Sequence, residues 1–168
     1  MKNIILIGFM GSGKTSTGKY VAQKLNRPIL SSDEMIVQKE GQPIAQVFEK
    51  SGETYFRQIE KNVVKELATK SNVVIDCGGG VILDPENIVT LKKNGIIIYL
   101  ITSPEFIYQR VKNRRHRPLL NVPDPQSKIR ELLEQRQSLY ESSADLTINT
   151  DGKTPQQVGE ELLKIFHD

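Results

Sequence analysis

The run Gly8–Thr15 limits the possible folds more than any other part of the chain, because it reads Gly-Phe-Met-Gly-Ser-Gly-Lys-Thr and matches the phosphate-loop pattern G-x-x-x-x-G-K-S/T. An apolar run, Asn3–Ile7, precedes it and an amphipathic stretch, Thr15–Leu25, follows it. A phosphate loop needs this order, since backbone N–H groups of a glycine-rich turn meet phosphate oxygens at a helix N-terminus. The alternative is a strand–turn–helix unit without a ligand.

The loop residues have separate expected roles. Lys14 can reach the β- and γ-phosphates of a nucleotide, and the Thr15 hydroxyl can bind Mg²⁺. GTPases, motor ATPases and small-molecule kinases all carry this loop. The 168 residues suit one domain, and the sequence lacks the Asn-Lys-x-Asp motif that reads guanine, so a small-molecule kinase is favoured. The residues expected to bind ATP here are Gly11, Ser12, Gly13, Lys14, Thr15 and Ser16.

Short apolar runs alternate with longer amphipathic stretches along the whole chain. The runs are almost continuous Ile, Val and Leu, which is typical of parallel strands covered on both faces. This alternation predicts an α/β, doubly wound parallel sheet flanked by helices. The predicted strands are Asn3–Ile7, Pro28–Leu30, Val73–Ile75, Ile96–Leu100 and Leu146–Ile148. The predicted helices are Thr15–Leu25, Gly52–Thr69, Pro85–Lys93, Pro104–Arg114, Gln126–Tyr140 and Thr154–Phe166.

Composition excludes several classes of protein. Hydrophobic residues are 38% and charged residues 26% of the chain, which argues against disorder and against a membrane protein. The N-terminal apolar run is too short for a signal peptide. A net charge of +3 gives no reason to expect nucleic acid as a partner. The lone Cys77 cannot form an internal disulfide, so we expect a reducing, cytoplasmic location.

Polar residues near the ends of later strands predict a second site. Asp33 could orient a hydroxyl group, and Arg57 offers a planar fork for a carboxylate. The run Gly78–Gly80 would let a ligand approach the backbone closely. Structural interpretations stay open for each of them. Asp33 could cap the next helix, the glycines could form a simple turn, and Arg57 could pair with Glu53 or Glu60.

One polar segment, Asn113–Pro125, interrupts the alternation of strands and helices. It holds three arginines and three prolines and shows no periodicity. Long loops without secondary structure often act as lids, so we expect a lid over about residues 112–125, with a solvated connector as the alternative.

Taken together, the motifs are similar to those of one known family. In their order and spacing the chain resembles the shikimate kinase family from end to end. The motifs that carry the resemblance are Gly11-Ser12-Gly13-Lys14, Ser32-Asp33, Gly52-Glu53-x-x-Phe56-Arg57-x-x-Glu60, Gly78-Gly79-Gly80, Arg117-Pro118-Leu119-Leu120 and Arg136-x-x-x-Tyr140.

The resemblance implies ATP-dependent phosphorylation of the shikimate 3-hydroxyl to shikimate 3-phosphate, in the pathway to chorismate and the aromatic amino acids. It also implies a five-stranded parallel sheet, a mobile lid and a substrate-binding helical segment at about residues 32–60. Shikimate contacts would fall on Asp33, Arg57, Gly79 and Arg136. Of these, Arg57 and Arg136 would hold the carboxylate, whereas Asp33 and the Gly79 backbone would hold ring hydroxyls.

On the nucleotide side, the resemblance makes Arg117 a lid arginine that meets the ATP phosphates. Arg110 and Lys153 would lie near the adenine. The catalytic residues implied in this way are Lys14, Asp33 and Arg117.

The chain departs from the family pattern at Ser31, where most members have an aspartate that helps to hold the Mg²⁺ water shell. Asp76 ends the third predicted strand, at the position of the Walker-B acid in related enzymes. We therefore expect Thr15 and Asp76 to hold Mg²⁺, unless Asp76 merely caps the strand end.

Two other functions remain open at this point. The chain could be another P-loop kinase of a small hydroxylated acid, such as a gluconate-type enzyme. It could also be a non-catalytic nucleotide-binding relative, an idea that only Ser31 supports. We expect a monomer that binds ATP and shikimate but neither nucleic acid nor a membrane.

Overall fold

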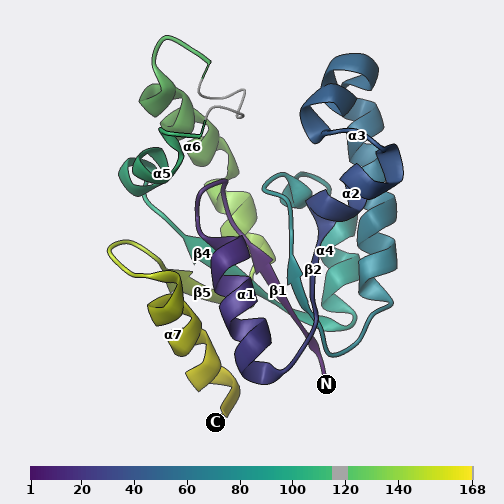
Figure 1. The fold of residues 1–168 in the computed structure, drawn as a ribbon, viewed down its shortest axis with the longest axis vertical. Coiled ribbons are helices and arrows are strands. Elements are labelled where there is room, and N and C mark those ends of the chain that lie inside the picture. The colour runs from purple at the N-terminus through teal and green to yellow at the C-terminus, as the bar shows by residue number, and fades with distance from the viewer. Residues whose placement is uncertain (115–120, 168) are drawn as a thin grey trace.

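A computed structural model describes residues 1–114 and 121–167. Five strands form one sheet in the order β2-β3-β1-β4-β5, and every neighbouring pair is parallel (Figure 1). The predicted five-stranded parallel sheet is therefore confirmed. The central strand β1 leads into the phosphate loop, so the loop emerges in the middle of the sheet. The strands are β1 (Asn3–Ile7), β2 (Ile29–Ser31), β3 (Val74–Asp76), β4 (Gly95–Ile101) and β5 (Leu146–Asn149).

Helices cover both faces of the sheet, which explains why most residues of its strands are apolar. On one face, Ile4 and Leu6 pack with α1 (Lys14–Leu25) and α7 (Pro155–His167). On the other face, Ile5 and Ile7 belong to the cluster that includes side chains from the remaining large helices. These helices are α3 (Ile44–Ala68), α4 (Pro85–Lys92), α5 (Pro104–Val111) and α6 (Pro125–Ser143).

The segment after β2 is more helical than its periodicity predicts. Helix α2 (Ser32–Glu40) follows β2 directly, and α3 begins at Ile44 instead of the predicted Gly52. Gly52, with φ 81° and ψ 173°, interrupts α3. Figure 1 shows α2 and the first part of α3 opposite α5 and α6, above the carboxyl edge of the sheet. The two groups of helices therefore stand on either side of the loops that follow the strands.

Elsewhere the observed bounds differ little from the predicted ones. Pro85 and Pro104 occupy the first helical turn, as predicted, because proline lacks the N–H that a helix start leaves unpaired. Helix α5 ends at Val111, earlier than the predicted Arg114, and α6 begins at Pro125. Residues 115–120 of the expected lid lie outside the described residues. Across residues 1–114 and 121–167, no helix combines the length and apolar character needed to cross a membrane.

Candidate active site

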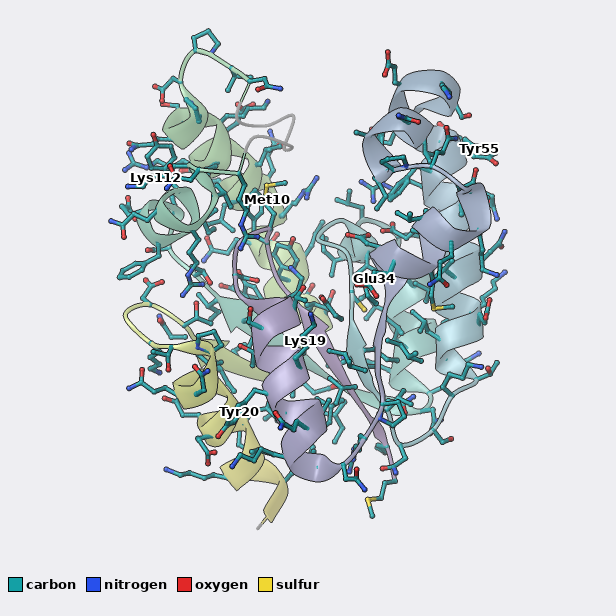
Figure 2. The ribbon with its side chains drawn as sticks, in the orientation of Figure 1. Met10, Lys19, Tyr20, Glu34, Tyr55 and Lys112 are labelled. Atoms are coloured by element: carbon teal, nitrogen blue, oxygen red, sulfur yellow. The ribbon has the colours of Figure 1, made fainter. Side chains whose placement is uncertain are left out.

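A cavity of about 640 Å³ lies at the carboxyl ends of the strands. Met10 of the phosphate loop and Glu34 of α2 lie on opposite sides of it (Figure 2). This is the position where open α/β sheets bind ligands. Of the residues predicted to bind nucleotide, metal or substrate, those that line the cavity are Gly11, Ser12, Gly13, Lys14, Thr15, Ser16, Asp33, Asp76, Gly79, Arg110 and Lys153.

The phosphate loop has the backbone that a phosphate cradle requires. Gly11 has a left-handed φ of 74°, and a Cβ there would come within 2.7 Å of Val111 Cγ1, so only glycine fits. Lys14, the first residue of α1, is buried, and its Nζ donates hydrogen bonds to the carbonyl oxygens of Gly8 (2.8 Å) and Phe9 (3.1 Å). Its ammonium group is thus already held beside the loop.

Two side-chain oxygen groups, a hydroxyl and a carboxylate, meet beside the loop. The Thr15 hydroxyl donates a 2.5 Å hydrogen bond to Asp76 Oδ2, and the Asp76 side chain at the end of β3 is buried. Asp76 therefore does more than cap its own strand. Mg²⁺ prefers one or two carboxylate or hydroxyl oxygens and completes its shell with water and phosphate oxygens, so this pair fits the ion. Within the described part of the chain, no group of three or more His, Cys, Asp or Glu side chains could hold a metal by itself.

Ser31 is the sheet neighbour of Asp76, because the two are paired in the register of β2 and β3. Its Oγ accepts a hydrogen bond from the Glu34 N–H (3.3 Å) and caps α2. The interpretation of Asp33 as the helix cap is thus wrong: Asp33 lies in the first turn of α2 and lines the cavity.

Arg110 connects α5 with both the phosphate loop and the loop after β5. Its guanidinium donates to the Gly11 carbonyl oxygen (3.1 Å) and, more weakly, to Thr150. Desolvation lowers the pKa of Arg110, although Asp151 opposes this shift. Lys153 donates to the Asn149 carbonyl oxygen (3.0 Å) and pairs with Glu161 (2.8 Å). Arg110 and Lys153 therefore lie at the edge of the cavity nearest β5, away from Asp33.

The run Gly78–Gly80 passes close to two side chains of the second site. A Cβ on Gly78 would lie 2.5 Å from Asp33 Oδ1, and a Cβ on Gly80 would overlap the Arg57 guanidinium. Gly79 has more room, since its Cβ would be 3.5 Å from the Gly8 carbonyl oxygen. A side chain at Gly78 or Gly80 would therefore displace Asp33 or Arg57 from its present position.

A buried carboxylate, Glu60, organises the charges of the second site. It is 1% exposed and accepts a 2.9 Å hydrogen bond from Arg57. Burial raises the pKa of Glu60; Arg57 and, more weakly, Arg136 oppose this shift, whereas the charge of Asp33 adds to it. Arg57 also pairs with Glu53 (3.5 Å), so it forms both of the ion pairs that the structural interpretation offered as alternatives.

Arg57 and Arg136 do not line the main cavity. Arg57 borders Gly80, and the Arg136 guanidinium lies 6.0 Å from the centre of the Phe9 ring in the phosphate loop. Both act on the pKa of Glu60, so they approach the same region from α3 and α6. Arg117 lies outside the described residues.

Sequence reasoning assigned no role to Ser32 and Tyr140, and it named Glu60 only as a possible ion-pair partner of Arg57. All three residues had been quoted within motifs. The hydroxyl contacts of Ser32 and Tyr140 depend on how distant elements pack.

A phosphate loop at the centre of a parallel sheet, beside a second pocket with a carboxylate and arginines, defines a P-loop domain of the small-molecule kinase class. A family model described as "Shikimate kinase" matches residues 10–167. The chain belongs to the shikimate kinase family.

Relatives and solved structures agree with this family. The shikimate kinase of Caldanaerobacter subterraneus subsp. tengcongensis is 46% identical over 99% of this chain and 96% of its own length. That of Thermodesulfovibrio yellowstonii is 48% identical over 99% and 95%. The structure of shikimate kinase from Acinetobacter baumannii in complex with shikimate superposes with a TM-score of 0.94 at 39% identity, covering 99% of this chain and 93% of that one. The predicted membership is confirmed, and neither a gluconate-type nor a non-catalytic relative is supported.

Proposed function

We propose that this chain transfers the γ-phosphoryl group of ATP to the 3-hydroxyl of shikimate. The observation that carries the proposal is that Lys14 and Asp33, from the phosphate loop and from α2, line the same cavity. In the reaction, the shikimate oxygen forms a bond to the γ-phosphorus as the bond from that phosphorus to the bridging oxygen of ADP breaks. The hydroxyl proton passes to the Asp33 carboxylate, and ADP leaves.

On the nucleotide side, the loop N–H groups and the N-terminus of α1 would bind the phosphates. Lys14 would exchange its two carbonyl acceptors for phosphate oxygens and neutralise the charge that develops during transfer. The position of Arg110 supports a role beside the adenine base of ATP, because Arg110 is hydrogen-bonded to Gly11 and Thr150 at the edge of the cavity away from Asp33. Lys153 and the lid residue Arg117 stay predictions.

On the shikimate side, Arg57 and Arg136 would hold the carboxylate, since guanidinium groups match its geometry. Glu60 would hold Arg57 in place through their 2.9 Å contact. Asp33 and the Gly79 backbone would bind ring hydroxyls. Because the phosphoryl transition state is loose, orientation and charge neutralisation by these residues matter more than the basicity of Asp33.

A coupled assay of ADP release tests the function directly. ADP release should depend on shikimate and not on gluconate, and ³¹P NMR should identify the product as shikimate 3-phosphate. The matched control is Lys14→Ala, which should lose this release, whereas Lys19→Ala, on an exposed position of the same helix, should keep it. ADP release with gluconate but not with shikimate would overturn the proposal.

We further propose that Thr15 and Asp76 hold Mg²⁺, which when bound would neutralise phosphate charge. The carboxylate has moved from β2 to β3 by one step across the sheet, since Ser31 and Asp76 are register partners. The Asp76 carboxylate can therefore reach the Thr15 hydroxyl, while Ser31 remains free to cap α2.

Electron paramagnetic resonance with Mn²⁺ and ADP tests the metal site without turnover. Asp76→Asn should weaken Mn²⁺ binding about tenfold, the effect expected when one of a few ligands is lost. The exchange variant Ser31→Asp/Asp76→Ser should recover most of it. Asp84→Asn, a carboxylate on the other side of the glycine turn, is the control. Unchanged Mn²⁺ binding in Asp76→Asn would show that Asp76 is not a ligand.

The remaining expectations stay proposals. They are a single kinase domain over residues 1–168 with a substrate-binding helical segment at about 32–60, closure of a lid over 112–125, a monomer, a cytoplasmic location, and no nucleic-acid or membrane partner. Light scattering after gel filtration would measure the oligomeric state.

A further inference from the structure

The glycine turn 78–80 is attached to two helices through side-chain hydroxyl groups. Ser32 Oγ, at the start of α2, accepts a 2.8 Å hydrogen bond from the Gly78 N–H. The hydroxyl of Tyr140, in the last part of α6, donates to the Gly79 carbonyl oxygen. One hydroxyl thus holds the start of the turn and the other holds its middle.

Both hydroxyl-bearing residues are buried, and the Ser32–Gly78 contact is buried with them, whereas the Tyr140–Gly79 contact is partly buried. Ser32 and Tyr140 are each 0% exposed. The Tyr140 ring stacks on Tyr99 of β4, with 4.9 Å between ring centres and 14° between planes. Burial also raises the pKa of Tyr140 to about 12, so its hydroxyl keeps the proton that it donates at neutral pH. Water cannot easily replace either buried hydroxyl, so the two bonds restrict the orientation of the turn more strongly than surface hydrogen bonds would.

Each hydroxyl is close in sequence to a residue that the proposed function places on shikimate. Ser32 immediately precedes Asp33, and Tyr140 lies one helical turn after Arg136 on α6. The turn itself carries Gly79, between the glycines that face Asp33 and Arg57. The same two bonds therefore connect α2, α6 and the glycine turn, which together with α3 form the proposed shikimate site (the alcohol pocket).

The peptide geometry shows what these bonds control. The carbonyl of one residue and the N–H of the next share a plane and point in opposite directions. A bond to the Gly79 carbonyl oxygen therefore aims the Gly80 N–H away from Tyr140. Consecutive glycines have wide backbone freedom and would not keep this direction unaided. Within residues 1–114 and 121–167, the N–H groups of Gly79 and Gly80 have no protein acceptor. Gly80 is buried, whereas Gly79 is partly exposed and lines the cavity, so a ligand in the cavity meets the turn at Gly79.

We propose that Ser32 and Tyr140 are positioning residues for the acceptor substrate: their buried hydroxyl groups fix the glycine turn so that the Gly79 backbone faces a polyhydroxylated acid in the cavity. This inference rests on the proposed function, because it concerns the same pocket. It assigns the two hydroxyls to recognition of the alcohol and not of the nucleotide. Neither residue touches the phosphate loop through a hydrogen bond in the described residues.

Tyr140→Phe tests the inference because it keeps the ring stacked on Tyr99 and removes only the oxygen. Since that oxygen also interacts with Arg136, the result is read together with that of Ser32→Ala. Loss of one buried hydrogen bond should raise the KM for shikimate about three- to tenfold. The Kd for ADP, measured by calorimetry, should stay within about twofold. Tyr20→Phe is the matched control, because it removes a tyrosine hydroxyl bonded to Glu160 at the α1–α7 contact and should change neither value.

Ser32→Ala provides an independent second variant, with the same expected rise in shikimate KM. Because both hydroxyls act on one turn, the double variant should lose less than the product of the two single losses. Shikimate should also shift the Gly79 and Gly80 amide signals in ¹⁵N-labelled wild-type protein, and this shift should shrink in Tyr140→Phe.

The outcomes separate failure of this inference from failure of the proposed function. If wild-type protein does not phosphorylate shikimate, the proposed function fails. If it does, an unchanged shikimate KM in both single variants would overturn the inference. Equal weakening of ADP and shikimate binding would also overturn it, because the hydroxyls would then serve only the fold. Should Tyr140→Phe fail to fold, Ser32→Ala decides by the same measurements.

Discussion

The two halves of the site are built in different ways. The phosphate half is centred on the eight consecutive residues Gly8–Thr15 at the junction of β1 and α1, and the contacts from Lys14 to Gly8 and Phe9 span five or six residues. Asp76 and Arg110 reach this segment from distant parts of the chain. The alcohol half draws on α2, α3, the glycine turn and α6, and its contacts include one between residues 61 positions apart. The phosphate loop at the centre of the first half is local, whereas the second half has no such local centre and exists only after the chain has packed. Substitutions should therefore act on catalysis in the first half and on substrate binding in the second.

The largest expected effect belongs to the local half. Lys14→Ala should lower kcat about 10²- to 10³-fold, the usual result of removing a charge that stabilises a transition state. The shikimate KM should change little, because Lys14 is proposed to act on the nucleotide phosphates and not on the shikimate carboxylate. Steady-state kinetics with varied shikimate measure both values. A variant that lost shikimate affinity and kept kcat would contradict the division into two halves.

Arg57→Ala should show the opposite pattern. The carboxylate that Arg57 is proposed to hold is remote from the reacting hydroxyl, so the KM for shikimate should rise about 10- to 100-fold, as expected for charged hydrogen bonds. The change in kcat should be smaller. Lys61→Ala, on the same helix but paired with Asp84 and Glu86 on the surface, is the control. Unaltered shikimate affinity in Arg57→Ala would remove the substrate assignment.

Glycine substitutions resolve the alcohol half further. Gly80→Ala would force its methyl group into the Arg57 guanidinium and should raise the shikimate KM about fivefold, or about 1 kcal/mol of displacement. If Gly80→Ala has no further effect on the shikimate KM in a protein that already carries Arg57→Ala, the two changes act on one contact. Independent, fully additive losses would instead place Gly80 in another role. The nucleotide affinity of all three proteins, measured in parallel, should be the same.

The smallest expected effect is on stability and comes from Glu60. Burial raises its pKa above the ordinary value of 4.5, so the folded chain binds more protons than the unfolded chain between that value and the raised one. The contribution of Glu60 to stability is therefore fully present at lower pH and is lost as pH rises through this window. The Tm of wild type relative to Glu60→Gln should fall across the same window and then become constant. A difference in Tm that is independent of pH would mean that the Glu60 pKa is not raised.

Most of the fold was predictable from residue patterns. The five predicted runs, which are mostly Ile, Val and Leu, all became strands, because helices cover both faces of the sheet and the side chains of its strands are mostly buried. The segment between β2 and Gly52 was the exception. Its residues show little helical periodicity, and α2 exposes much of its surface, so its helical state depends on the Ser31 cap and on packing against α3.

The residues of the candidate site also divide into those predictable from local spacing and those whose contacts depend on packing. Lys14 and Thr15 could be assigned from spacing, because the strand, turn and helix that position them adjoin one another in the chain. The contact between Thr15 and Asp76 could only be suspected, and the ties from Ser32 and Tyr140 to the glycine turn could not be anticipated at all. Hydrogen bonds between groups dozens of residues apart leave no periodic signal, since they depend on the register of strands and the rotation of helices.

The sequence by itself determined the α/β architecture, the phosphate loop and the family, because each is set by the order and spacing of neighbouring residues. Only the tertiary structure decided that Asp76 stands one step from Ser31, that Glu60 is buried under Arg57, and that two hydroxyls hold the glycine turn. The physical reason is range: backbone preference and amphipathic spacing act within a few residues, whereas the alcohol pocket is formed by polar groups that meet only when the core excludes water.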